Sequence, residues 1–472
     1  MESARAVTNT RTRPWAVAAA LVLGLSASLL AQEPETTEEE LPPPEPSQPA
    51  DEQVQERLQA LEEAIRELRG TPAEAPGEAA PTTVLDRIAA LEQVVRDLKA
   101  AKAAPKAEPP AAAATEEKPD LEKRVETLEE HAKNLGIKVS GSLAVTYGLN
   151  FEGPDSRANR LRVFDIEDDE FNVNLLDIIL EKPVDGAGTW GFRADLDAGE
   201  DAAIFQAFGF NDGDNFELEQ AFVEWVAPVG TGLTLRLGKF VTSHGAEVIE
   251  SADNWNTSRS FLFGFAIPFT HTGLLATYAP CEQLTLSAGV VNGWDNVDDN
   301  NDGKTFHGMA KWVPCEKFNV VLSGTYGAEQ AGDNGDHRGL LTALFTYQAC
   351  DDLTLMLDVN YAGEEGAATG RKTGEDAQWY GVAAYARYRV SDAWYVAARA
   401  EVFDDDDGAR MGVVGQTVEE LTFTGSWKPF DFAEVRLEYR HDWADINVFD
   451  DASAPANDDE QDTLSLEVIY RF

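Results

Sequence analysis

The chain has 472 residues, of which 38 are Lys or Arg and 84 are Asp or Glu, so its formal net charge is −46. Such an acidic chain is a poor ligand for nucleic acid, because the phosphates would repel it. Its 10 Trp, 11 Tyr and 23 Phe are too many for a wholly disordered acidic chain, and its three Cys are too few for a disulfide-built scaffold.

Residues 1–31 are predicted to be a secretory signal peptide. Arg5, Arg11 and Arg13 supply its positive region, and residues 16–30 form the apolar stretch that should follow. The alternative is an N-terminal membrane anchor, although the stretch is short for a span and a Pro- and Glu-rich segment follows at once. We therefore expect the mature protein to work outside the cytoplasm.

Residues 32–136 are predicted to be a linker, because they are rich in Pro, Ala and Glu and contain no aromatic residue. Three segments in it, 54–69, 84–99 and 120–135, repeat apolar residues at heptad spacing, which predicts short coiled-coil helices. Helices this short are marginal in water unless their apolar seams find a partner. We expect them to join copies of the chain, most simply as a homotrimer. The alternative is lone amphipathic helices on a tether.

From residue 137 to Phe472 the chain consists of short segments in which apolar and polar residues alternate, as in strands with two different faces. Seven short turns alternate with eight longer acidic, Gly- and Asn-rich loops, which predicts sixteen strands. Bacterial outer-membrane barrels have this asymmetry, with short periplasmic turns and long external loops. The predicted fold is an all-β transmembrane β-barrel of about 16 antiparallel strands. A disordered or coiled-coil helical tether in the periplasm precedes it.

Two blocks of this region resemble a known family. The segments 238–278 (GKFVTSHGAEVIESADNWNTSRSFLFGFAIPFTHTGLLATY) and 288–306 (AGVVNGWDNVDDNNDGKTF) are similar to signature blocks of the putative β-barrel porin family (OmpL-like). The resemblance extends over about 137–472, and the linker lies outside it. It implies an outer-membrane pore for small solutes.

The longest predicted loop, 242–270, is unusually apolar in its second half. A loop on the cell surface has no reason to carry such a run, whereas a loop folded into the lumen does. We expect it to narrow the pore, with its own acids on one side and arginines of the wall on the other. The acids are Glu247, Glu250 and Asp253, and the arginines are Arg193, Arg236, Arg387, Arg399, Arg436 and Arg440. The alternative is that the arginines pair with wall acids such as Asp195, Glu401 and Glu438.

Residues 298–303 (DDNNDG) match the start of a calcium-binding loop. The twelfth position is Met309 rather than Glu, so an EF-hand is incomplete. We therefore expect no cofactor and no bound metal beyond loose surface binding of Ca²⁺ by Asp298, Asn300 and Asp302.

The three cysteines, Cys281, Cys315 and Cys350, all fall on predicted short turns. Neighbouring turns lie two strands apart, about 10 Å, which is too far for an unstrained disulfide unless the turns lean together. Because three is odd, at least one thiol is free or pairs between chains.

The sequence does not predict an enzyme. Its six His have no zinc-protease spacing, and no Gly-x-Ser-x-Gly motif occurs. Ser243 and His244 are adjacent, but a barrel hydrolase would need a Ser and a His on neighbouring strands. We expect His271 on the wall, at the end of the loop 242–270.

Two hypotheses follow. The first is a passive outer-membrane porin, through which small polar solutes and ions diffuse in a water-filled lumen. The second is a structural anchor whose coiled-coil tether links the barrel to the periplasm or cell wall. The expected partners are outer-membrane lipid, the barrel assembly machinery, which would read the terminal Phe472, and further copies of the chain.

Overall fold

The computed structural model describes residues 135–472 except 211–213, 370–371 and 414. The predicted signal peptide and the heptad segments of the linker, apart from the final residue of the third, lie outside the described residues. Within the described part of the chain, no helix has the length and apolar character needed to cross a bilayer.

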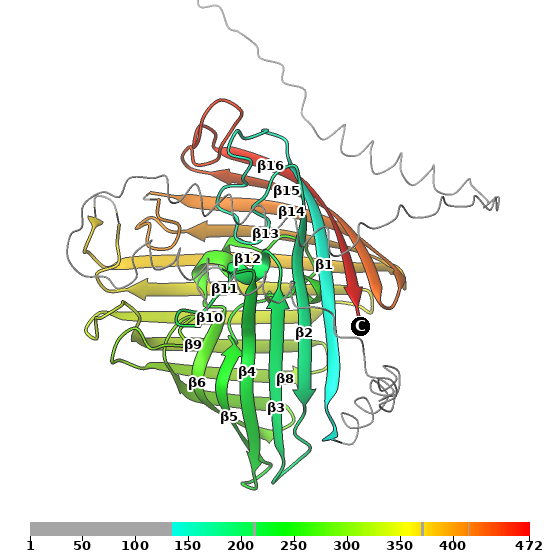
Figure 1. The fold of residues 1–472 in the computed structure, drawn as a ribbon, viewed down its shortest axis with the longest axis vertical. Helices are drawn as coiled ribbons and strands as arrows, with labels where there is room; N and C mark the ends of the chain where they lie inside the picture. Colours follow the sequence, from blue (N-terminus) through cyan, green and yellow to red (C-terminus); the bar gives the residue numbers. More distant parts are fainter. Residues whose placement is uncertain (1–134, 211–213, 370–371, 414) are drawn as a thin grey trace, which may run out of the picture. The chain divides into compact units, whose positions relative to one another are not determined.

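The described residues form sixteen strands in one closed antiparallel barrel, in which each strand pairs with the next along the chain (Figure 1). The strands are β1 (Lys138–Asn150), β2 (Glu170–Lys182), β3 (Trp190–Ala198), β4 (Phe216–Ala227), β5 (Leu233–Val241), β6 (Thr270–Cys281), β7 (Leu284–Val291), β8 (Thr305–Cys315), β9 (Phe318–Ala328), β10 (His337–Gln348), β11 (Leu353–Glu364), β12 (Ala377–Ser391), β13 (Trp394–Asp404), β14 (Thr417–Phe430), β15 (Ala433–Ala444) and β16 (Glu460–Arg471). The predicted fold class and strand number are confirmed.

The barrel closes between its first and last strands. β1 pairs with β16 from Ser142 opposite Arg471 to Asn150 opposite Thr463. Gly141 and Phe472 exchange two backbone hydrogen bonds of 3.0 Å, so both ends of the barrel segment lie at the same rim. We call this end, which carries the short turns, the turn rim, and the opposite end the loop rim.

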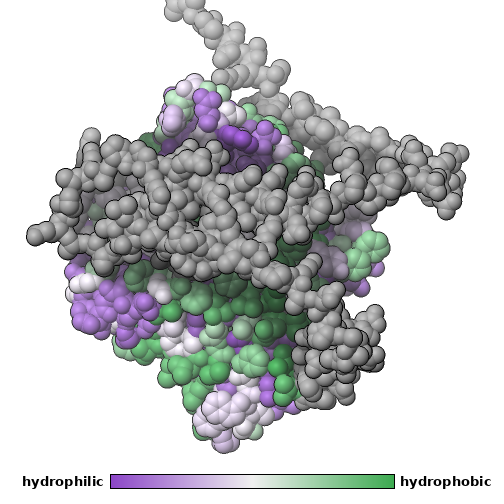
Figure 2. All heavy atoms as spheres, viewed as in Figure 1, coloured by the Kyte–Doolittle hydropathy of each residue, from purple (hydrophilic) through white to green (hydrophobic). Residues whose placement is uncertain are grey.

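The two faces of the wall differ as the alternation predicted. On β16, Leu466, Val468 and Tyr470 face outward and are exposed, whereas Glu467 faces the lumen and is buried. Figure 2 shows hydrophobic residues over much of the wall that the view leaves uncovered. Tryptophans stack in pairs near the turn rim, Trp190 with Trp225 and Trp394 with Trp427. An apolar outer band edged by aromatic residues is typical of a barrel in a membrane.

The connection between β5 and β6, residues 242–269, folds into the lumen and is called loop 3 here. It contains a 3₁₀ turn, η2 (Ser251–Asp253), and a short π-helical turn, η3 (Leu262–Ala266). The expectation that this loop packs on the inner wall is confirmed, with one difference in its bounds, because Thr270 already belongs to β6.

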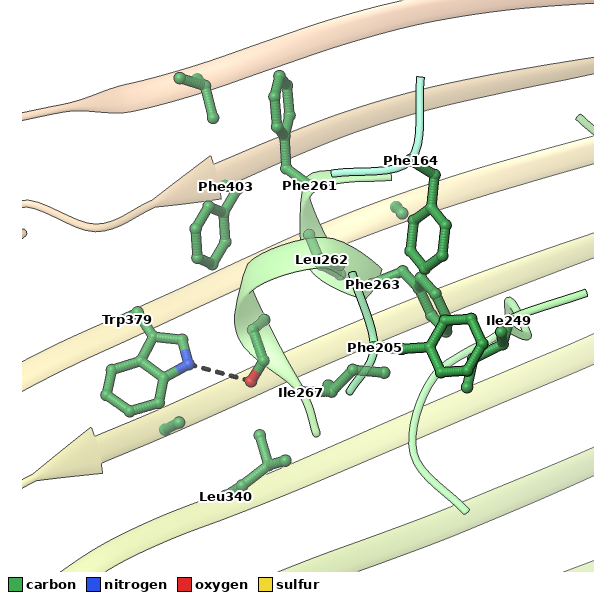
Figure 3. Packing of buried hydrophobic residues seen from close by; sticks show 14 of the residues in the cluster. Phe164, Phe205, Ile249, Phe261, Leu262, Phe263, Ile267, Leu340, Trp379 and Phe403 are labelled. Atoms are coloured by element: carbon green, nitrogen blue, oxygen red, sulfur yellow. Dashed lines mark hydrogen bonds between the residues drawn. The ribbon is translucent and has the colours of Figure 1, made fainter. Parts of the chain in front are cut away.

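An apolar cluster fills the space between loop 3 and the wall (Figure 3). Trp379 of β12 donates a hydrogen bond of 3.2 Å from its indole nitrogen to the carbonyl of Ala266. Leu262 approaches β12 closely because Gly381 has no side chain, and a Cβ added there would lie 2.6 Å from Leu262 Cδ1. The cluster also receives side chains from other long loops, namely Phe164, Phe205 (next to η1, Asp201–Ala203), Trp294 and Phe449. Apolar packing therefore fixes both loop 3 and its neighbours over the lumen.

Candidate functional site

Carboxylates of the wall bind the backbone of loop 3. Glu401 of β13 accepts hydrogen bonds from the amides of Phe261 and Leu262, at 2.8 and 2.5 Å. Glu438 of β15 accepts bonds from the amides of Thr257 and Ser258, at 2.7 and 2.8 Å. A loop inside a barrel must satisfy its buried amides somewhere, and these two buried carboxylates do so. The sequence reasoning offered Glu401 and Glu438 only as partners for arginine and did not foresee this role.

Arg399 connects loop 3 to the wall through an ion pair. Its guanidinium lies 2.6 Å from Oε1 of Glu247 and donates to the carbonyl of Ser258 at 2.7 Å, both in the loop. Its Nε lies 2.7 Å from Oε1 of Glu420 on β14. The Arg399 side chain is fully buried, so these two residues, which were expected to face each other across the pore, instead form a direct and buried ion pair.

Two further arginines, both on β15, also contact loop 3. Arg436 donates to the carbonyls of Ser251 and Asn254, at 2.9 Å each, and pairs with wall glutamates. Arg440 donates to the carbonyl of Arg259 at 2.5 Å and pairs with Asp442 of its own strand. The structure thus brings Arg399, Arg436 and Arg440 together against loop 3.

The other three predicted arginines lie toward the turn rim and have wall partners. Arg193 pairs with Asp195 at 2.8 Å, which is the arrangement that the alternative hypothesis described. Arg236 pairs with Glu224 at 2.7 Å, and Arg387 stacks 4.1 Å above the ring of Tyr395. The side chains of Arg193 and Arg236 are 29% and 30% exposed, so charged groups in contact with water remain on this side of loop 3.

The three predicted loop acids have three different surroundings. Glu247 pairs with Arg399, as described above. Glu250 lies with Asp195 and Glu219, where one carboxylate oxygen of each is within 4.8 Å of the others. Burial and neighbouring acids raise the pKa of Glu250 above its ordinary value. Asp253 is exposed and lines a polar cavity of about 300 Å³, whose other charged residues include Arg387, Lys428 and Arg471.

Polar side chains that face the lumen are buried on strands all round the barrel. Examples are Asp195 on β3, His307 on β8, Asp358 on β11, Arg399 on β13 and Glu467 on β16. These inward side chains therefore have little contact with water. A charged cavity, lined by Asp253, Arg387 and Lys428 among others, lies toward the turn rim.

Comparison with known proteins fits this geometry. Residues 136–472 match the family described as putative beta-barrel porin-2, OmpL-like. The chain belongs to this family. It is accordingly a porin-type barrel of the bacterial outer membrane, with the short turns of such barrels on the periplasmic side. No curated protein sequence matches the chain.

Several solved structures are similar to this chain at low sequence identity. The chain is similar to the outer membrane channel DcaP of Acinetobacter baumannii, with 12% identity and a TM-score of 0.49 over 71% of this chain and 97% of that chain. It is also similar to an anion-selective porin from Comamonas acidovorans, with 11% identity and a TM-score of 0.48 over 71% and 99%. Pseudomonas putida OprB gives 11% identity and a TM-score of 0.48 over 74% and 97%.

Three histidines of the porin barrel form a cluster that the sequence reasoning missed. His244 of loop 3, His271 of β6 and His307 of β8 are buried, and one ring nitrogen of each lies within 4.8 Å of the others. Burial and the two neighbouring imidazoles lower the pKa of His244 well below its ordinary value. Only the barrel register brings these residues together, because they are far apart in the chain and follow no motif.

Ser243 and His307 form the type of pair that a barrel hydrolase would need, with Ser243 Oγ 3.1 Å from His307 Nε2. A catalytic triad also requires an acid on the other ring nitrogen. Nδ1 of His307 has no hydrogen-bond partner among the described residues, so this pair lacks the third member of a triad.

The predicted surface residues lie where the turn and loop pattern put them. Asp298, Asn300 and Asp302 lie in the connection between β7 and β8, where the neighbouring Asp299 pairs with Lys304. Loose calcium binding there stays a prediction.

Cys281, Cys315 and Cys350 lie at the turn rim as expected, and each is exposed and unpaired.

Proposed function

We propose that the chain is an outer-membrane porin through which small polar solutes and ions diffuse passively, with loop 3 as its constriction. The observation that supports this most directly is the loop itself, which lies inside the barrel and is tied to the wall by the Glu247–Arg399 ion pair. A sixteen-stranded barrel is wide enough for an aqueous channel, and a loop in its lumen then sets the width and charge of the path.

The charged residues on the periplasmic side of the loop would orient a polar solute. Arg193, Arg236 and Arg387 supply positive charge there, and the exposed Asp253 supplies negative charge from the loop. Charges within a narrow, low-dielectric path act strongly on a solute, whereas charges on outer loops are screened within about 8–10 Å at physiological salt. We therefore expect these residues, rather than the net charge of −46, to set ion preference.

The proposal includes the parts of the chain on either side of the barrel. Residues 1–31 would direct export, and the terminal Phe472 would be read by the barrel assembly machinery. The heptad segments 54–69, 84–99 and 120–135 support a homotrimer joined in the periplasm.

A second function is favoured by the burial of the lumen-facing side chains. In this alternative the barrel is a membrane anchor, and the tether links it to the periplasm or cell wall. Ion pairs such as Arg436 with Glu467 would then serve only to fill and stabilise the lumen.

Liposome swelling tests the porin function. Vesicles that contain the folded mature protein should swell in isosmotic solutions of small sugars and amino acids and should not swell in solutions of large oligosaccharides. Empty vesicles are the control. Vesicles that remain unchanged in every small solute would contradict the porin and favour the anchor.

A further inference from the structure

The histidine cluster lies where loop 3 leaves the wall. His244 is the third residue of the loop, and His271 and His307 face it from β6 and β8. Their relative exposures are 2%, 0% and 4%, and the ring of His307 lies 5.7 Å from that of His244 and 5.2 Å from that of His271. Three imidazoles from three separate segments therefore converge in one buried place.

The hydrogen bonds of His271 show which of its nitrogens has a lone pair that could bind a metal ion. Nδ1 lies 3.0 Å from the carbonyl of Gly293. Because a carbonyl only accepts, Nδ1 must carry the proton, and Nε2 therefore presents a lone pair. The hydroxyl oxygen of Thr242 lies 3.1 Å from Nε2 and is in hydrogen-bond contact with it.

A chain of hydroxyl groups orients His307 in the same way. Ser323 Oγ donates to the carbonyl of Ser243 at 2.9 Å, and Ser243 Oγ donates to Ser323 Oγ at 3.1 Å. Ser243 Oγ is thus left to accept from His307 Nε2, which places the proton of His307 on Nε2. Nδ1 of His307 is then a bare lone pair, and it has no partner among the described residues.

His244 completes the set. Its Nδ1 lies 2.9 Å from Thr342 Oγ1, and its buried Nε2 has no hydrogen-bond partner in the described structure. A buried nitrogen left unpaired costs about 1–3 kcal/mol, so such an atom usually has a hydrogen-bond partner, a water molecule or an ion. In each histidine a neighbour fixes one nitrogen. The other has no partner in His244 and His307, and in His271 it meets only the hydroxyl of Thr242. Histidines that bind metal ions likewise have one nitrogen fixed by a hydrogen bond.

We propose that His244, His271 and His307 bind one transition-metal ion, with Zn²⁺ as the best-fitting class. Neutral imidazole nitrogens suit Zn²⁺, Cu²⁺ and Ni²⁺, whereas Mg²⁺ and Ca²⁺ prefer oxygen. Zn–N bonds of about 2.0–2.1 Å in a tetrahedron place ligand nitrogens about 3.3 Å apart. The present separations, all within 4.8 Å, would close to that value by small side-chain rotations. Three histidines leave a fourth position for water.

The bound ion would stabilise the folded barrel. It would join the start of loop 3 to β6 and β8, on the opposite flank from the Arg399 contact with β13 and β14. Any ligand that binds only the folded arrangement stabilises it by mass action. This effect does not depend on whether the barrel conducts solutes.

Metal binding to the untagged, folded mature protein tests the proposal. The protein is first stripped with chelator, and Zn²⁺ is then titrated in calorimetry, with Co²⁺ absorption as a second probe of tetrahedral nitrogen ligation. We expect one saturable site per chain. His307→Gln should weaken that site by at least about tenfold, and Ser243→Ala, which keeps all three ligands, should weaken it about 10–100-fold.

Controls separate this site from the acidic surface. His337→Gln and His441→Gln change histidines outside the cluster and should leave the site unchanged. Weak binding that persists in His307→Gln belongs to surface carboxylates. The proposal is overturned if the folded wild type shows no saturable Zn²⁺ or Co²⁺ site, or if folded His307→Gln retains the site at full affinity.

Discussion

At the residue scale, Arg399 joins loop 3 to the wall through ion pairs on both sides. Its fully buried guanidinium lies between Glu247 and Glu420 and also reaches the carbonyl of Ser258. Alternation along β13 predicted that it points inward. Its partners could not be predicted, because they depend on the path of the loop through the lumen.

Arg399→Met should strongly destabilise the barrel. The change leaves Glu247 and Glu420 buried without their counter-charge, and breaking a buried pair in this way costs about 3–5 kcal/mol. Urea unfolding in lipid vesicles, followed by Trp fluorescence, measures the free energy of unfolding.

Arg389→Met is the matched control for this measurement. Arg389 pairs with Asp352 at 2.8 Å, but its side chain is 54% exposed, so little change in stability is expected. Equal unfolding free energies for the two variants would show that the Arg399 ion pairs are not needed for stability.

At the element scale, loop 3 is the feature that distinguishes this barrel from an empty cylinder. Its apolar run was visible in the sequence and correctly predicted that the loop lies inside. The hydrogen bonds from its amides to Glu401 and Glu438 could not be predicted, because they join residues far apart in the chain. The same reason hid the histidine cluster.

Leu262→Asp should release the loop from the wall. Leu262 is 1% exposed and lies in η3 against β12, so a carboxylate there loses apolar contacts and is buried without a partner, at a cost of about 2–5 kcal/mol. We expect loop 3 to become sensitive to protease and the conductance of each channel to rise.

Val248→Asp is the control within the same loop, because Val248 is 39% exposed and should accept a charge. Unchanged conductance and protease resistance in folded Leu262→Asp would mean that the apolar cluster does not hold the loop in place.

At the scale of the whole molecule, the alternation of turns and loops in the sequence predicted the architecture of the barrel. Seven turns and eight loops in alternation fixed the strand number, and the closing pair of β1 with β16 follows from that even count. The pattern could not show how full the lumen is. That depends on how the side chains of loop 3 and of the other long loops, such as Phe164 and Phe449, pack together.

Single-channel recording of the purified mature protein in a planar bilayer, with a salt gradient across it, tests the porin function most directly. We predict small, discrete conductance steps that occur in groups of three, and the reversal potential will give the ion preference. The steps should be small because loop 3 and buried lumen side chains occupy the middle of the barrel. Silence from protein that is demonstrably folded and heat-modifiable would contradict the open-pore account and leave the barrel as an anchor for its tether.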